Sequence, residues 1–175
     1  MRASKRLSTG LRLASAIILL AAPVHAQVGN APPPARKIPG ITVDDPVPGA
    51  CVNCHVNRVE ENLDVRLSTI MRDWNTAVDP ALFARVQHTA PEGVTLTGRH
   101  PKLDPEVFQD IPAACLECHG RASRKAPPFV RLLHAIHLQG GEANHFLTAF
   151  QGECTLCHKL DPKTAAWKVP SGPEK

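Results

Sequence analysis

The sequence predicts a mainly α-helical fold with much loop, and an interior that amino-acid side chains fill only in part. Aromatic residues make up 4% of the 175 residues, and tyrosine is absent. The chain also holds 17 prolines and 11 glycines, which favour turns and loops over long regular elements. A small chain of this composition buries a thin hydrophobic core, so we expect a further component inside it.

The six cysteines identify that component. All of them lie in C-x-x-C pairs, and a histidine follows each pair directly, in the segments CVNCH, CLECH and CTLCH. This is the attachment signature of c-type haem, in which two thiols form thioethers with the vinyl groups and the histidine ligates the iron. We therefore expect three c-type haems, attached through Cys51, Cys54, Cys115, Cys118, Cys154 and Cys157, with proximal iron ligands His55, His119 and His158.

Two other uses of the cysteines remain to be weighed against haem. Zinc could be held by four sulfurs from the first two motifs, but this leaves Cys154 and Cys157 without a role. Three local disulfides would suit an exported chain. Neither alternative explains why a histidine follows every pair, so the sequence favours haem.

The three motifs and the surplus of histidines resemble the small multihaem c-type cytochromes of bacterial periplasms, broadly of class III. The resemblance covers Cys51 to His158. It implies a core formed largely by three covalently bound haems, histidine at both axial positions of each iron, and a role in electron transfer.

The distal iron ligands must come from residues outside the three motifs. The segment RLLHAIHL (131–138) places His134 and His137 three residues apart, on one face of an expected helix with apolar neighbours. Burying two unpaired imidazoles there costs free energy, which iron ligation offsets. We expect both to be ligands, and the resemblance implies that they serve two different haems.

Several residues compete for the third distal position. His145 ranks first because apolar residues follow it, and His100 ranks second because it precedes a motif much as His137 does. His88 ranks third, at the end of an expected helix. Met71 is an alternate that would raise the potential of one haem, although it lies on an apolar helix stripe where packing is the default.

The expected secondary structure is mostly short helices. Apolar spacing predicts an amphipathic helix over 59–74. Asp-Pro pairs predict helix starts at Asp79 and Asp104, and a further helix is expected over 128–138. The segment GVTLTG (93–98) is the one candidate strand.

The chain divides into four expected parts. Residues 1–26 have the basic start, short apolar stretch and small residues of a cleaved secretory signal peptide. A proline-rich extended arm follows at 27–50, then the three-haem domain at 51–160 and a C-terminal tail at 161–175. His25 would be lost with the signal, and no membrane span is expected in the mature chain.

Charge argues against nucleic acid as a partner. The formal net charge is +4, from 20 basic and 16 acidic residues. Four of the basic residues lie in the expected signal peptide, so 16 basic residues balance 16 acidic ones in the mature chain. Nucleic-acid binding calls for a clustered basic face, which this balance does not favour.

These features predict an exported electron carrier, in the periplasm or at the cell surface. Its expected partners are other cytochromes, a quinol dehydrogenase or a terminal reductase. One alternative is an enzyme with an open iron site for nitrite, hydroxylamine or peroxide. Another is a wiring subunit of a larger respiratory complex.

Overall fold

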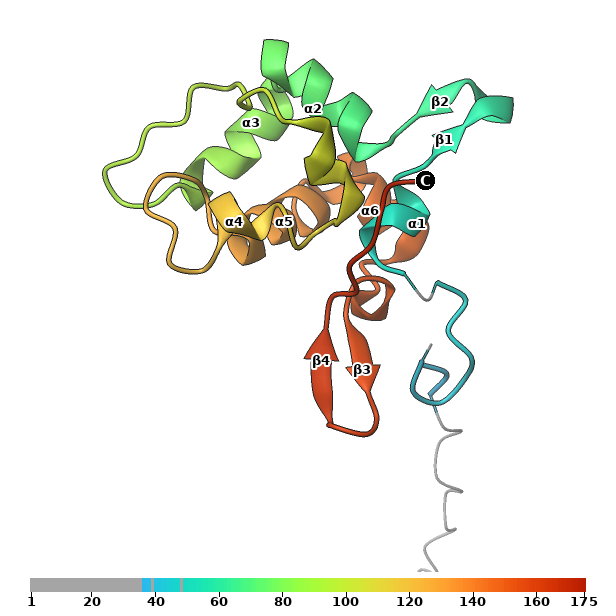
Figure 1. Ribbon diagram of the computed structural model, residues 1–175. Helices are drawn as coiled ribbons and strands as arrows, with labels where there is room; N and C mark the ends of the chain where they lie inside the picture. Colours follow the sequence, from blue (N-terminus) through green and yellow to red (C-terminus); the bar gives the residue numbers. More distant parts are fainter. Residues whose placement is uncertain (1–35, 39, 48) are drawn as a thin grey trace, which may run out of the picture. The chain divides into compact units, whose positions relative to one another are not determined.

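A computed structural model of the chain describes residues 36–38, 40–47 and 49–175. The expected signal peptide and the first part of the arm, 27–35, lie outside the described residues. The described chain is partly helical, with much loop and two two-stranded antiparallel sheets (Figure 1). Among the described residues, no helix is long and apolar enough to cross a membrane.

The regular elements are short. The α-helices are α1 (Cys51–Cys54), α2 (Leu67–Thr76), α3 (Pro80–Val86), α4 (Leu116–His119), α5 (Phe129–Leu138) and α6 (His145–Phe150). The 3-10 helices are η1 (Val59–Glu61), η2 (Gln87–Thr89), η3 (Pro105–Gln109), η4 (Gly141–Ala143) and η5 (Cys154–Leu156). The strands are β1 (Asn57–Arg58), β2 (Leu63–Asp64), β3 (Lys159–Asp161) and β4 (Ala166–Lys168).

The helix expected over 59–74 begins later than its apolar spacing indicates. Residues 57–64 form the β1–β2 hairpin, which Asn62 turns with a left-handed φ of 49°. Asparagine tolerates this conformation better than most residues, so it ends any helix that starts at Val59. Helix α2 therefore starts only at Leu67.

The Asp-Pro pairs at Asp79 and Asp104 start helical segments, as expected. Asp79 accepts a hydrogen bond from the backbone N–H of Leu82 at 2.9 Å and caps α3. Asp104 accepts one from Glu106 at 3.1 Å, although η3 is a 3-10 helix. An aspartate cap satisfies an N–H group that lacks a partner within the helix.

The segment GVTLTG is not a strand. Residues 93–98 are a loop, and the backbone carbonyl of Gly98 accepts from Val78 at 2.8 Å instead of from a neighbouring strand. Because a strand needs a partner for its backbone groups, alternating polarity alone does not produce one.

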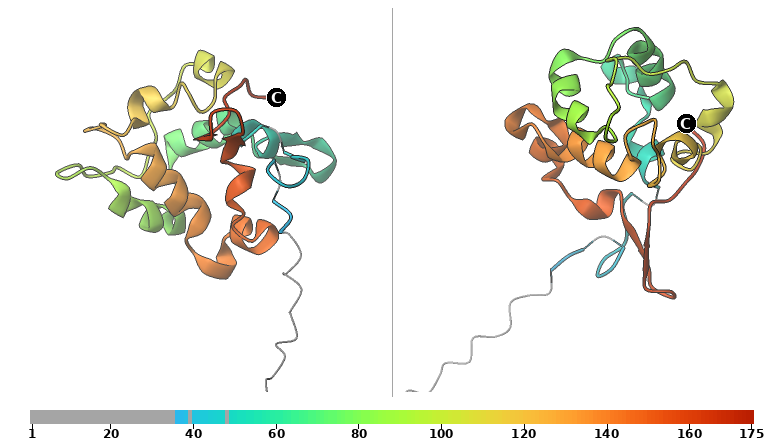
Figure 2. Two further views of the ribbon diagram at one scale, coloured as in Figure 1. Left: turned by 90° about the horizontal axis from the view of Figure 1, so that it is seen from below. Right: turned by 90° about the vertical axis from the view of Figure 1, so that its left-hand side faces the viewer.

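Helix α5 lies at the centre of the helical packing. It contacts α3 on one side and α6 on another, and both views of Figure 2 show α3 beside α5. The buried apolar residues of the described chain are few and mostly small. They are Ala50, Val52, Val86, Ile111 and Ala135. This thin core agrees with an interior that side chains alone do not fill.

The C-terminal residues belong to the domain instead of forming a separate tail. Strand β4 pairs with β3, which spans the boundary expected at residue 160. Beyond it, Gly172 and Ile111 exchange backbone hydrogen bonds of 2.8 and 2.9 Å. The sequence did not predict this pairing, because nothing near Gly172 in the chain indicates its distant partner, Ile111.

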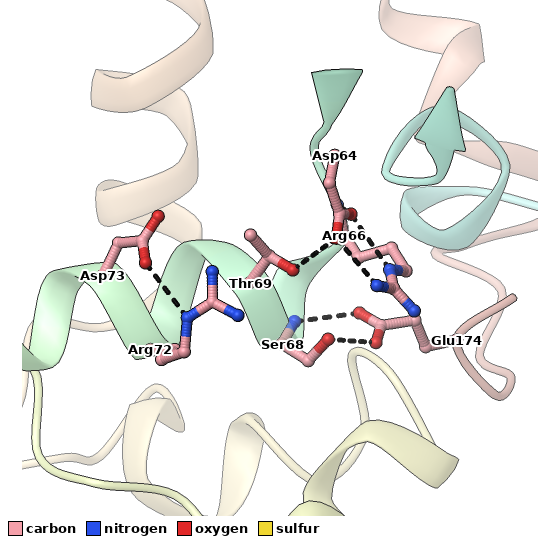
Figure 3. A network of polar contacts seen from close by, with 7 residues as sticks. All are labelled: Asp64, Arg66, Ser68, Thr69, Arg72, Asp73 and Glu174. Atoms are coloured by element: carbon pink, nitrogen blue, oxygen red, sulfur yellow. Dashed lines mark hydrogen bonds and ion pairs between the residues drawn. The ribbon is translucent and has the colours of Figure 1, made fainter. Parts of the chain in front are cut away.

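Glu174, near the end of the chain, forms hydrogen bonds with the start of α2 (Figure 3). Its carboxylate accepts from the backbone N–H of Ser68 at 2.9 Å and also from the Ser68 hydroxyl. Close by, Asp64 accepts two hydrogen bonds from Arg66, at 2.9 and 2.7 Å. A carboxylate suits this position because the first N–H groups of a helix carry partial positive charge.

We expect Glu174→Gln to lower the free energy of unfolding of the protein by about 1–2 kcal/mol, because hydrogen bonds to a charged acceptor are lost. Glu60→Gln, on the exposed surface of η1, is the matched control and should change it by less than about 0.5 kcal/mol. Denaturant unfolding followed by circular dichroism measures both. Equal effects would show that the contact at α2 contributes nothing.

The described part of the arm is less extended than its prolines predict. The carbonyl of Ile38 accepts from Ile41 at 3.0 Å and Thr42 at 2.9 Å, which closes a turn at Gly40 with φ 74°. Glycine adopts this φ without strain. Farther on, Asp45 forms a largely buried ion pair of 2.8 Å with Lys159, so the arm is attached beside the third motif.

Candidate haem-binding sites

Each C-x-x-C-H motif folds into a single helical turn. In all three, the backbone N–H of the histidine donates to the carbonyl of the first cysteine, at 2.9 Å in the first two and 2.8 Å in the third. Residues i, i+3 and i+4 of a helical turn share a face. The two thiols and the imidazole of each motif therefore project to the same side, as attachment to one haem requires.

The three motifs lie close to one another. Burial raises the pKa of the Cys51 thiol to about 11, and the nearby Cys157 and Cys115 add to the increase. Burial also raises the pKa of the Cys157 thiol, and the nearby Cys54 adds to this increase. Because such charge effects fade over short distances, the first motif lies near both of the others.

All six cysteines are free thiols, which gives no support to three local disulfides. Within the described ranges, no group of three or more His, Cys, Asp or Glu side chains could hold a metal ion. A four-sulfur zinc site would be such a group. Two axial histidines would not be, because a porphyrin supplies the other four iron ligands.

Every motif histidine faces one histidine from elsewhere in the chain. The ring centres are 6.2 Å apart for His55 and His137, 6.0 Å for His119 and His100, and 6.2 Å for His158 and His134. We call these the first, second and third sites, each with the cysteines of its own motif.

The spacing of these pairs suits two imidazoles on one iron. A bond from imidazole to a first-row metal is about 2 Å long, and the ligating nitrogen lies about 1 Å from the ring centre, so the two centres should be about 6 Å apart. Ordinary aromatic contacts cover the same range. The one-to-one matching of three motif histidines with three others is what distinguishes ligand pairs from chance contacts.

Backbone carbonyls fix the orientation of four of the six rings. The Nδ1 atoms of His55 and His119 lie 2.9 and 2.7 Å from the carbonyls of Val65 and Pro127. Those of the distal rings lie 3.0 and 2.8 Å from carbonyls as well, in the pairs His137–Leu133 and His100–Pro101. A carbonyl only accepts, so Nδ1 carries the proton and Nε2 keeps its lone pair for a metal.

Burial favours the same protonation state. It lowers the pKa of His55, His119 and His137 below the usual histidine range, because the charged form loses its hydration. A neutral imidazole is the form that binds iron. The local environment therefore supports ligation by these three rings.

Helix α5 serves two sites. His134 and His137 lie about one turn apart on it, and they face His158 and His55 respectively. The helix thus joins the third site to the first. The carbonyl of Leu133, one turn before His137, provides its hydrogen bond.

The other candidate ligands lie away from the motif histidines. His145 packs its ring against Phe150, with 5.6 Å between the centres. His88 is exposed in η2, and its backbone carbonyl accepts from Arg131 at 3.2 Å. Met71 lines a hollow between α2 and η3, beside Leu103 and Phe108. The geometry therefore favours His100 for the third distal position, in contrast to the order expected from the sequence.

Asn144 is an important residue that the sequence did not single out. Its buried side chain donates to the carbonyls of Ile136 and Gln139 at 2.8 and 2.6 Å, and accepts from the N–H of Phe146 at 3.0 Å. It thereby closes the end of α5 and caps the start of α6. An asparagine just before a helix was the available signal.

We expect Asn144→Ala to lower the free energy of unfolding of the protein by about 2–3 kcal/mol, because two carbonyls and one N–H lose their partner. Asn57→Ala in the exposed strand β1 is the control, with an expected change of less than about 0.5 kcal/mol. Denaturant unfolding measures both variants. A loss no larger than that of the control would contradict the capping role.

A comparison of the chain with protein-family models, curated proteins and solved structures finds no match.

Proposed function

We propose that the protein is a three-haem c-type cytochrome that transfers electrons outside the cytoplasm. The observation that carries this proposal is the pairing of each motif histidine with a single second histidine at 6.0–6.2 Å. Bound at such a pair, haem supplies one-electron chemistry, and its iron has no open position for a substrate.

The residues of the chain have separate tasks in this function. The six cysteines attach the cofactors, and the six paired histidines hold the irons. The carbonyls around His55, His119, His137 and His100 keep four of those rings in place. Fixed ligands suit electron transfer, because the iron surroundings then change little between oxidation states.

Location and partners follow from the same proposal. The basic and apolar pattern of residues 1–26 supports export, which agrees with haem attachment outside the cytoplasm. We propose the periplasm as the main location. The partners would be a quinol dehydrogenase or cytochrome donor and a terminal reductase or surface acceptor.

Haem counting and ligand binding test the proposal on the purified protein. We expect three covalently bound haems by mass and by pyridine haemochrome absorbance. We also expect carbon monoxide to leave all three reduced haems unchanged, because every iron has two imidazoles. Fewer than three haems would contradict the proposal, and rapid binding at one haem in three would favour the open-site enzyme.

A near-infrared spectrum separates histidine from methionine ligation. We expect no sulfur-to-iron charge-transfer band, because Met71 lies in the hollow beside Leu103 and Phe108. A clear band would assign Met71 to one iron. Met71→Leu, which keeps the side-chain volume, would then remove the band.

A further inference from the structure

We infer that the third site, formed around His158 and His134, is where the protein holds an electron most tightly. This inference rests on the proposed function, because it concerns the reduction potential of an iron held by these two histidines. Three features set the third site apart: its hydrogen bonds, the charges beside it and its place among the sites.

The carbonyl acceptors are distributed unequally among the sites. In the first and second sites, both rings have a backbone carbonyl within 3.0 Å of Nδ1. In the third site, formed by His134 and His158, neither ring has a hydrogen-bond partner within 36–38, 40–47 and 49–175. Of the two histidines on α5, the ring of His137 thus has a carbonyl partner, whereas the ring of His134 has none among the described residues.

These hydrogen bonds change how strongly an imidazole donates to iron. A carbonyl that accepts the Nδ1 proton draws it partly away, and the ring becomes a more basic ligand at Nε2. A more basic ligand stabilises ferric over ferrous iron and lowers the reduction potential. Without these acceptors, the third site should have the highest potential.

A neighbouring charge acts in the same direction. Lys159 directly follows His158 in the sequence, so a positive charge lies beside the third site. A positive charge favours the reduced iron, although the ion pair of Lys159 with Asp45 weakens this effect.

The arrangement of the sites gives the electron a route. Cys51 lies near both Cys115 and Cys157, so the first site is the neighbour of the other two. Helix α5 also joins the first site to the third through His137 and His134. An electron that enters at the second site can therefore pass through the first and collect at the third.

The three ring pairs should have distinct magnetic signatures. The two ring planes meet at 22° in the second site, 59° in the third and 84° in the first. Each imidazole donates into the iron d orbital perpendicular to its plane. Parallel rings raise the energy of one of two iron d orbitals above that of the other. Perpendicular rings act on both orbitals alike and leave their energies nearly equal. Electron paramagnetic resonance should thus show a rhombic signal for the second site and a far more anisotropic one for the first.

A redox titration of the oxidised holoprotein, followed by electron paramagnetic resonance, tests the order. We expect the ferric signal of the third site to disappear first. When each molecule has received one electron, the ratio of reduced to oxidised iron should be at least tenfold higher at the third site than at either other site. For a one-electron couple this ratio corresponds to a difference in reduction potential of about 59 mV. His134→Met, His137→Met and His100→Met assign the signals, because each should remove a different one. Lys159→Gln provides a second assignment that keeps every ligand, since it should lower the potential of the third site most.

Earliest loss of a signal assigned to the first or second site would overturn this order. Equal reduction of all three sites would overturn it as well. Both results would still leave three haems with two histidines each, so the proposed function would survive them. Failure to find three such ferric signals would instead contradict the proposed function itself.

Discussion

Replacing both Cys51 and Cys54 by serine is expected to abolish the cooperative unfolding transition of the protein. The first motif lies near both of the others, and two of the five buried apolar residues, Ala50 and Val52, lie at the start of its helical turn and within it. With so few buried side chains, the proposed haem would provide much of the interior. Loss of a cofactor that folds with the chain removes its binding free energy from stability, on the order of 10 kcal/mol for a structural metal. This exceeds the total stability of many small domains.

Mass spectrometry and thermal circular dichroism measure this effect. The double variant should carry at most two haems and show a broad transition without a defined midpoint. Cys54→Ser alone is the matched control, because Cys51 can still form one thioether and His55 can still bind iron. Replacing Cys154 and Cys157, where Cys154 is exposed, should cost less stability. A sharp, unshifted transition in the first double variant would show that the haem is not part of the core.

Short-range features of the site were predictable from the sequence. The spacing of Cys51, Cys54 and His55 suits the proposed haem attachment, and a helical turn brings such residues to one face. Helical spacing likewise places His134 and His137 on one side of α5. Both statements depend on residues that are at most four positions apart, where helix geometry fixes direction.

The pairing of ligands was not predictable, because it depends on contacts between distant segments. His145 was favoured for its apolar neighbours, yet its ring packs against Phe150. His100 lies between Arg99 and Pro101 and looks solvated in the sequence. Its position comes from α2, where Trp74 accepts from its backbone N–H at 2.8 Å and Asn75 donates to its carbonyl at 3.0 Å.

The same limit applies to the fold. Helix starts at Asp79 and Asp104 could be predicted, because each cap lies within three residues of the N–H group that it binds. The contacts of Glu174 with Ser68 and of Gly172 with Ile111 join segments that are far apart. Local patterns do not identify such partners, so the last residues looked like a free tail.

Replacing His100 by alanine is expected to open one iron to external ligands. His100 is the only histidine that the structure places opposite His119 among the described residues. Its removal should leave the second site with one axial ligand, and the iron should become high-spin and bind carbon monoxide when reduced. The change should affect one haem in three, while the first and third sites, which use His137 and His134, stay low-spin.

His145→Ala is the matched control, because it removes the same side chain from the competing position. We expect it to bind no carbon monoxide, since its ring contacts Phe150 instead of a motif histidine. Adding imidazole to the His100 variant should restore the low-spin spectrum by occupying the open position. A low-spin, unreactive His100 variant together with a reactive His145 variant would reverse the assignment, and His145 would then be the ligand opposite His119.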